Sequence, residues 1–144
     1  GGVYRPATLV KRDPSAPLND GERVISERTS AMVRDVLDYV VKEGTGGNAD
    51  AEGYRVGGKT GTADKPSRGA YNEDARIATF LGAFPIDDPK YVLLVMVDEP
   101  IPQEGTFGFA TGGWVAAPAF KRIVERTAPM LGLEKVVPAE GESD

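Results

Sequence analysis

The residues best suited to chemistry lie in one short, glycine-rich segment, Val56–Ala63, which carries one cation and two hydroxyls. Glycines weaken a strand and are usually placed where a ligand or another backbone comes close. Lys59 would place an ammonium group beside whatever occupies a neighbouring cleft, where it can attract an anion or assist proton loss from a hydroxyl. The segment therefore predicts a strand that binds and stabilises a ligand, and not one that supplies the nucleophile.

Thr60 and Thr62 are separated by Gly61, so their side chains would share one face of a strand. Two hydroxyls with the Lys59 cation nearby would suit a carboxylate. The backbone N–H of Thr62 could at the same time point at a developing oxyanion. A Lys-Thr-Gly alone is a weak signal, and its setting between paired glycines and a predicted hairpin is what strengthens it.

The composition excludes several kinds of chemistry. The 144 residues include no cysteine and no histidine. This chain on its own therefore cannot supply a thiolate nucleophile, a histidine-dependent triad or a common zinc site. We expect neither a metal nor a cofactor. The formal charge is -5 and the basic residues are scattered, which argues against nucleic acid because phosphates need a clustered basic surface. No apolar run is long enough to span a bilayer.

The surrounding pattern predicts the elements that would position the segment. Ser26 is a good N-cap for a helix that ends at Gly44. Its apolar stripe, which we expect to pack, comprises Met32, Val33, Val36, Leu37, Val40 and Val41. Residues 64–75 indicate an exposed loop, and residues 77–84 and 91–97 indicate two strands of a hairpin. The second strand is apolar on both faces, so we expect it to be central in a sheet covered on both sides.

A second helix is predicted over residues 114–131, with Pro118 near its start. The tail, residues 134–144, is acidic and built of small residues, and we expect it to be disordered.

The segment Gly58–Ala63 resembles the third motif of the serine acyl-transferases that include penicillin-binding proteins and serine β-lactamases. The segments around it resemble one group, the class B penicillin-binding proteins, and in particular the division-septum transpeptidase. Besides the helix before the motif, these segments are Gly1–Pro6, Thr79–Pro85, Asp88–Tyr91, Val97–Pro100 and Ala116–Phe120. The resemblance runs from residue 1 to about residue 133.

The resemblance implies an α+β fold, an antiparallel sheet with packed helices that is part of a penicillin-binding transpeptidase fold. It implies a peptidoglycan D,D-transpeptidase, which cross-links stem peptides ending in D-Ala-D-Ala by serine acyl transfer during cell division and is the target of β-lactams. In this reading Lys59 assists proton transfer. Thr60, Gly61 and Thr62 bind the substrate or drug carboxylate, and the Thr62 N–H supplies half of an oxyanion hole.

The resemblance also implies a periplasmic location, an anchor in the inner membrane through a helix absent from this chain, and membrane proteins of the division machinery as partners. The chain departs from the family in one respect: it contains no Ser-x-x-Lys, no Ser-x-Asn and no Ser-x-Asp. We therefore expect residues 1–133 to be the C-terminal half of a transpeptidase domain that is inactive alone and leaves apolar surface open. The missing N-terminal half, or an intertwined second copy, would cover that surface.

Two alternatives remain open at this point. One is a non-catalytic penicillin-fold module that serves as a binding or scaffold subunit of the division machinery, which the missing nucleophile favours for this chain taken literally. The other is a β-lactamase or a β-lactam sensor, which shares the Lys-Thr-Gly motif but fits the flanking segments less well.

Overall fold

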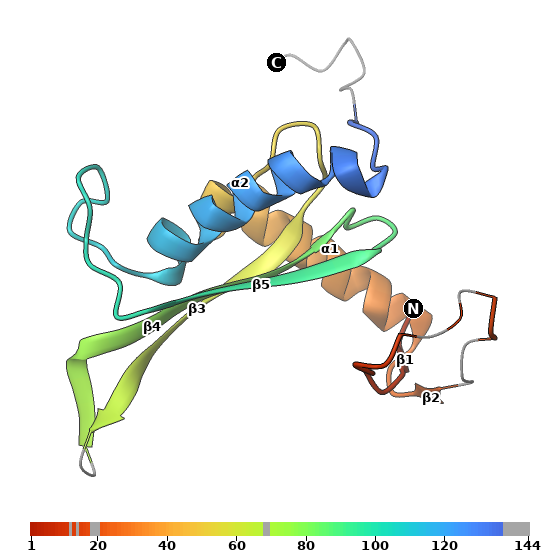
Figure 1. The fold of residues 1–144 in the computed structure, drawn as a ribbon, viewed down its shortest axis with the longest axis horizontal. Coiled ribbons are helices and arrows are strands. Elements are labelled where there is room, and N and C mark those ends of the chain that lie inside the picture. Colours follow the sequence, from red (N-terminus) through yellow and green to blue (C-terminus); the bar gives the residue numbers. More distant parts are fainter. Residues whose placement is uncertain (12, 14, 18–20, 68–69, 137–144) are drawn as a thin grey trace.

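The computed structural model describes residues 1–11, 13, 15–17, 21–67 and 70–136. Within them the chain forms an α+β structure built on a three-stranded antiparallel sheet of order β3–β4–β5, with α2 lying across one face of the sheet (Figure 1). A separate two-stranded pair, β1 (Val3–Tyr4) and β2 (Glu22–Arg23), precedes the first helix. Residues 137–144 of the predicted acidic tail lie outside the described residues.

The central strand of the sheet is longer than predicted. The bounds are β3 Gly57–Ser67, β4 Ala70–Phe84 and β5 Tyr91–Asp98. The prediction of a loop over residues 64–75 is wrong for the part that the structure describes, because the β3–β4 ladder continues past the pair Asp64–Arg76, after a register shift, to Lys65–Asn72 and Ser67–Ala70; residues 68–69 lie outside the described residues. The side chains of Asp64 and Arg76 form an ion pair, with Arg76 Nε 3.0 Å from Asp64 Oδ1. Opposite charges at facing positions stabilise a ladder, which polar composition alone does not reveal.

The register assigns the motif residues to faces of the sheet. Thr60 lies opposite Phe80, and Lys59 lies opposite Leu81. Leu81 in turn lies opposite Leu94 of β5. Facing residues share a face and successive residues alternate between faces. Thr60 and Phe80 therefore lie on one face of the sheet, whereas Lys59 is on the other face with Leu81 and Leu94.

Helix α1 (Glu27–Lys42) begins where the sequence predicts, because the Ser26 hydroxyl accepts a hydrogen bond from Thr29 N at 3.0 Å. The prediction that its apolar stripe packs is wrong for the first three stripe residues, whereas Leu37 and Val40 are half-buried. Val41, near the C-terminal end, is the α1 residue that is buried in the described structure. Exposed apolar side chains of the stripe are Met32, Val33 and Val36, with 57%, 48% and 61% exposure. Only the last turn of α1 reaches the core.

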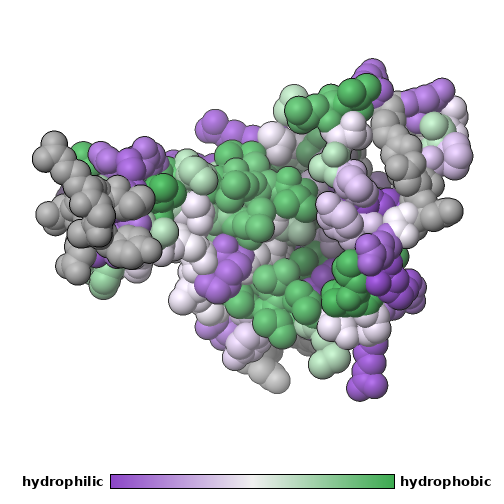
Figure 2. Space-filling view, turned by 90° about the horizontal axis from the view of Figure 1, so that it is seen from below, coloured by the Kyte–Doolittle hydropathy of each residue, from purple (hydrophilic) through white to green (hydrophobic). Residues whose placement is uncertain are grey.

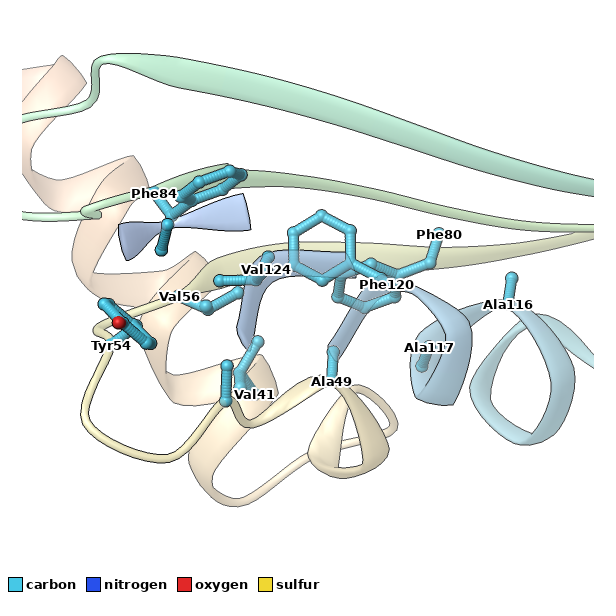
Figure 3. Packing of buried hydrophobic residues seen from close by; sticks show 12 residues of the cluster. Val41, Ala49, Tyr54, Val56, Phe80, Phe84, Ala116, Ala117, Phe120 and Val124 are labelled. Carbon is cyan, nitrogen blue, oxygen red and sulfur yellow. The ribbon is translucent and has the colours of Figure 1, made fainter. Parts of the chain in front are cut away.

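A buried aromatic group joins the sheet to α2 (Ala117–Thr127). The ring centroids of Phe80 and Phe84 lie 4.8 Å and 6.1 Å from that of Phe120, both in edge-on arrangements (Figure 3). Packed around it are Val41, Ala49, Ala51, Tyr54, Val56, Ala116, Ala117, Val124 and Ala128. This core holds α2 and the end of α1 against the face of the sheet that carries Thr60.

The predicted helix over residues 114–131 is found in three pieces. A π-helical turn, η2 (Gly112–Ala116), leads into α2, and a 3₁₀ turn, η3 (Pro129–Leu131), follows it. Pro118 stands in the first turn of α2, where its missing N–H costs nothing. π-helical turns are frequent at functional sites, and η2 lies beside the motif strand.

The face of the sheet away from α2 is apolar and exposed. The prediction that β5 is covered on both sides is wrong, because its residues alternate between partial burial and exposure. Val92, Leu94 and Met96 are 74%, 53% and 58% exposed, and Leu81 of β4 is 50% exposed. Figure 2 views the molecule from this side and shows apolar side chains gathered on it. Beyond β5, no further strand of the described chain extends the sheet.

Candidate functional site

The start of β3 has no room for side chains. A Cβ at Gly57 would lie 2.5 Å from Ile86 Cδ1, and a Cβ at Gly58 would lie 2.6 Å from Phe80 Cζ. These two glycines therefore admit core side chains and do not make space for a ligand. Because Gly57 and Gly58 have no side chains, the backbone at the start of β3 packs directly against the core.

A groove of about 510 Å³ opens beside the next part of β3. It lies between β3, the loop that follows α1 and the beginning of η2. Its lining residues are Gly44, Thr45, Gly47, Asn48, Thr60, Thr62, Thr111, Gly113 and Trp114. Thr60 and Thr62 thus share one face, as the sequence predicts, and that face looks into the groove. The lining combines polar side chains, four of them threonines, with apolar surface and includes no carboxylate, so an anion would meet no charge repulsion from it.

Thr62 is held by the backbone of η2. Gly112 N donates a hydrogen bond to Thr62 Oγ1 at 3.1 Å. A Cβ at Gly112 would lie 2.3 Å from the Thr79 carbonyl oxygen and 2.6 Å from that of Gly61, so only glycine allows η2 to come this close. The absent side chain of Gly61 faces the Thr79 hydroxyl, 2.5 Å from an added Cβ. Gly61 therefore spaces the two threonines without lining the groove.

Thr60 is held by the loop after α1. Its Oγ1 lies 3.1 Å from Thr45 Oγ1. The loop is fastened to η2, because Asn48 Nδ2 donates to the Gly113 carbonyl at 2.8 Å. A Cβ at Gly113 would lie 2.7 Å from the Thr45 carbonyl oxygen. The loop after α1, which forms this wall of the groove, is therefore held against η2 by the close backbone contact at Gly113 and by the hydrogen bond from Asn48.

Lys59 reaches the groove only at its rim. It stands on the opposite face of β3, beside Leu81, and is exposed. Its Nζ folds back and donates to the Thr60 carbonyl at 2.8 Å and to Thr60 Oγ1 at 3.3 Å. The predicted site residues Lys59, Thr60 and Thr62 are therefore brought together, with the ammonium at the free edge of β3.

Aromatic side chains stand at one end of the groove. The ring of Trp114, which lines it, is stacked on Phe109 with centroids 6.3 Å apart and meets Phe107 edge-on at 5.6 Å. Phe107 is 81% exposed and Phe109 is 52% exposed. This cluster gives the groove an apolar end opposite its polar walls.

Two ion-pair clusters hold the ends of the sheet. The carboxylates of Glu99 and Asp98 raise the pKa of Lys65, whose Nζ lies 2.8 Å and 3.0 Å from them. Asp38 of α1 raises the pKa of Arg55, which also pairs with Asp87 of the β4–β5 turn. The first cluster ties the β3–β4 hairpin to β5, and the second ties α1 to the segment that enters β3.

Sequence reasoning missed half of the groove. Thr45 and Asn48 belong to a glycine-rich exit from α1 that the sequence presents only as flexible, and Thr111 and Trp114 belong to a loop and helix start. A signal was present in the glycine pairs Gly46–Gly47 and Gly112–Gly113, which mark close approaches of backbone. No group of three or more metal-ligating side chains occurs in the described part of the chain.

The sequence model of the penicillin binding protein transpeptidase domain matches residues 1–125. The chain belongs to this family. Of its relatives, "Probable peptidoglycan D,D-transpeptidase FtsI" of Caulobacter vibrioides is 43% identical over 94% of this chain and 24% of its own length. "Stage V sporulation protein D" of Bacillus subtilis is 48% identical over 88% of this chain and 18% of its own length. The chain thus spans a quarter or less of these curated relatives.

Two solved structures confirm the predicted α+β transpeptidase fold. The transpeptidase domain of Burkholderia pseudomallei penicillin-binding protein 3 is 39% identical with a TM-score of 0.80, covering 95% of this chain and 40% of that one. Penicillin-binding protein 3 of Mycobacterium tuberculosis in complex with ampicillin is 32% identical with a TM-score of 0.69, covering 88% of this chain and 29% of that one. That relative therefore binds a β-lactam.

The predicted family is confirmed: the chain is part of a class B penicillin-binding transpeptidase domain of the FtsI and penicillin-binding protein 3 type. None of the helices in the described ranges has the length and apolar character needed to cross a membrane.

Proposed function

We propose that this chain forms one wall of the active site of a peptidoglycan D,D-transpeptidase and binds the carboxylate of D-Ala-D-Ala stem peptides and of β-lactams. One observation carries the proposal: the hydroxyls of Thr60 and Thr62 face the same groove while the Lys59 ammonium stands at its rim. Membership of the family, a relative named as a D,D-transpeptidase and a relative in complex with ampicillin support it.

The hydrogen bonds of the site leave protons for an anion. Thr62 Oγ1 accepts from Gly112 N, and a hydroxyl that accepts keeps its own proton for another partner. Thr60 Oγ1 accepts from Lys59 Nζ, because an ammonium group only donates. The Thr62 proton is thus free, and the Thr60 proton is free whenever Thr45 is the donor of the Thr45–Thr60 hydrogen bond. Hydroxyl protons beside a positive charge suit a carboxylate, since hydrogen bonds to an ionised acceptor are about twice as strong as neutral ones.

The direction of the backbone supports the proposed oxyanion role of Thr62. The Thr60 carbonyl accepts from Lys59 Nζ and so points to the open edge of β3. In an antiparallel ladder the N–H and C=O of one residue point the same way, and the direction recurs at every second residue. The Thr62 N–H is therefore directed to the same edge, where it would donate to the oxyanion of a tetrahedral intermediate. Gly61 contributes backbone between the two threonines.

The attacking serine would come from outside these 144 residues, because Ser-x-x-Lys is absent from them. The exposed apolar residues of α1 and of the sheet, among them Val36 and Leu94, support a covering partner. We take that partner to be the missing N-terminal half of the domain or an intertwined second copy. The complete protein would be periplasmic, anchored in the inner membrane and bound to membrane proteins of the division machinery. A stable, folded, monomeric chain in a size measurement would contradict the need for a partner.

Trapping of labelled penicillin by the complete transpeptidase tests the catalytic role. Lys59→Ala should abolish acylation at working drug concentrations, because it removes the cation that the proposal places beside the proton-transfer path and the carboxylate. Lys65→Ala is the matched control, since Lys65 stands on the same strand but pairs with Asp98 and Glu99. Acylation by Lys59→Ala at the wild-type rate would refute the role of Lys59.

The alternatives predict different outcomes of the same assay. A non-catalytic scaffold module, which the absence of Ser-x-x-Lys in this chain favours, would trap no penicillin even in the complete protein. A β-lactamase would release the drug rapidly after acylation, whereas a transpeptidase holds it. The relative named for stage V sporulation makes a sporulation transpeptidase the alternative to a division role, and localisation of a labelled complete protein to the division septum would decide between them.

A further inference from the structure

Thr45 is fixed in place although it belongs to an exposed loop. Gly44 N and Gly46 N, on either side of it, both donate to the Val40 carbonyl, at 3.1 Å and 3.0 Å, so the loop is closed onto the last turn of α1. On the other side, Gly113 lets the backbone of η2 approach the Thr45 carbonyl. The Thr45 hydroxyl is thereby held 3.1 Å from Thr60 Oγ1, across a sequence separation of 15 residues.

The Thr60 hydroxyl has two neighbours that compete for its orientation. It accepts from Lys59 Nζ at 3.3 Å, and it pairs with Thr45 Oγ1, where either oxygen can be the donor. A hydroxyl has one proton and two acceptor positions. When Thr45 donates, both acceptor positions of Thr60 are filled and its proton is free. When Thr60 donates, its proton is used on Thr45 and none remains for a ligand.

We infer that Thr45 is a positioning residue for carboxylate binding: it donates to Thr60 Oγ1 and thereby directs the Thr60 proton into the groove. The inference rests on the proposed function, in which Thr60 binds a carboxylate. An anion in the groove would select this arrangement, because it can only accept. Thr45 itself does not need to touch the ligand. Thr62 needs no such helper, since Gly112 N, which can only donate, already occupies one acceptor position of its hydroxyl.

The test compares two drugs in the complete transpeptidase. Acylation rates are measured with benzylpenicillin, which carries a carboxylate, and with its methyl ester, which does not. Thr45→Val keeps the shape of the side chain and removes the hydroxyl. We expect it to slow acylation by benzylpenicillin about fivefold, the effect of one neutral hydrogen bond, and to leave the methyl ester unchanged. Thr45→Ser should restore the benzylpenicillin rate.

A second variant separates this inference from the proposed function. Thr60→Val should also slow benzylpenicillin selectively, and Thr45→Val added to Thr60→Val should cost nothing more, because the first residue acts through the second. An equal slowing of both drugs by Thr45→Val, failure of Thr45→Ser to rescue, or additive effects in the double variant would overturn the positioning role alone. No selective loss in Thr60→Val would overturn the proposed function, and the positioning role with it.

Discussion

Substitution of Gly112 by alanine tests whether close contact between η2 and the motif strand holds the site. An added Cβ would lie 2.3 Å from the Thr79 carbonyl oxygen, whereas Cβ atoms essentially never come closer than 3.0 Å. Both nearest atoms are backbone oxygens of β3 and β4, which cannot rotate away. The start of η2 would therefore have to move back by about 0.7 Å, which lengthens the 3.1 Å bond from Gly112 N to Thr62 Oγ1 to about 3.8 Å, beyond hydrogen-bond range.

The cost of Gly112→Ala has two parts. Forcing an extra methyl group into a packed contact costs about 1–3 kcal/mol, and the lost hydrogen bond adds about 1 kcal/mol. We expect the free energy of unfolding, measured by urea denaturation, to fall by about 2–4 kcal/mol. Gly47→Ala is the matched control, because the nearest atom to an added Cβ there is the Val41 carbonyl oxygen at 3.8 Å, an ordinary contact.

The same variant should impair drug binding. Thr62 would lose the donor that fixes its hydroxyl, so labelled-penicillin acylation of the complete transpeptidase should slow by about tenfold or more, in line with a hydrogen bond to a charged group. Unfolding free energy within about 0.5 kcal/mol of wild type, the range of a neutral surface substitution, would refute the reasoning about close approach. Normal acylation in a destabilised Gly112→Ala protein would refute the link from η2 to Thr62.

Three further predictions concern the fold. Phe120→Ala, which empties the centre of the aromatic group, should lower the free energy of unfolding by about 3–5 kcal/mol in urea, and a loss below about 1 kcal/mol would contradict the core described. The folded-state pKa of Lys65 is raised, so its stabilisation is complete below its ordinary pKa of 10.5 and is lost as pH rises through the higher folded value. The unfolding midpoint of wild type should therefore fall more between pH 9 and pH 12 than that of Lys65→Met, and identical pH profiles would count against the cluster. Leu94→Lys on the open face should reduce self-association, measured by light scattering, with little loss of stability. Leu93→Lys, on the core face, should unfold the chain. Unfolding by Leu94→Lys with a stable Leu93→Lys variant would show that the faces are misassigned.

Much of the motif strand was predictable because its determinants are local. The alternation that places Thr60 and Thr62 together follows from strand geometry at any position in a fold. Ser26 begins α1 by a hydrogen bond within its own first turn. The α+β transpeptidase fold was predicted from the resemblance to the family, because local patterns alone do not specify how the elements are arranged.

The errors lie where distant residues or absent neighbours decide the outcome. The apolar stripe of α1 and the two-sided apolar strand β5 predict burial, but in this chain Met32, Val33 and Val36 of α1 and one side of β5 stay exposed. An apolar pattern predicts that a face is covered, but it does not predict whether this chain or another polypeptide covers it. Residues 64–67 and 70–72 are largely polar but pair in the β3–β4 ladder, with a register shift between Asp64 and Lys65, and such pairing depends on how two segments of the chain meet.

The sequence by itself determined that Lys59, Thr60 and Thr62 occur on one glycine-rich strand, and that the two hydroxyls share a face, because the strand repeat of two residues is a property of the backbone. Only the tertiary structure decided that this face opens into a groove, that Lys59 reaches it around the strand edge, and that Thr45 and Gly112 hold the two hydroxyls. The contacts of Thr45 and Gly112 join residues 15 and 50 positions apart, so they depend on how the chain packs and not on any local pattern.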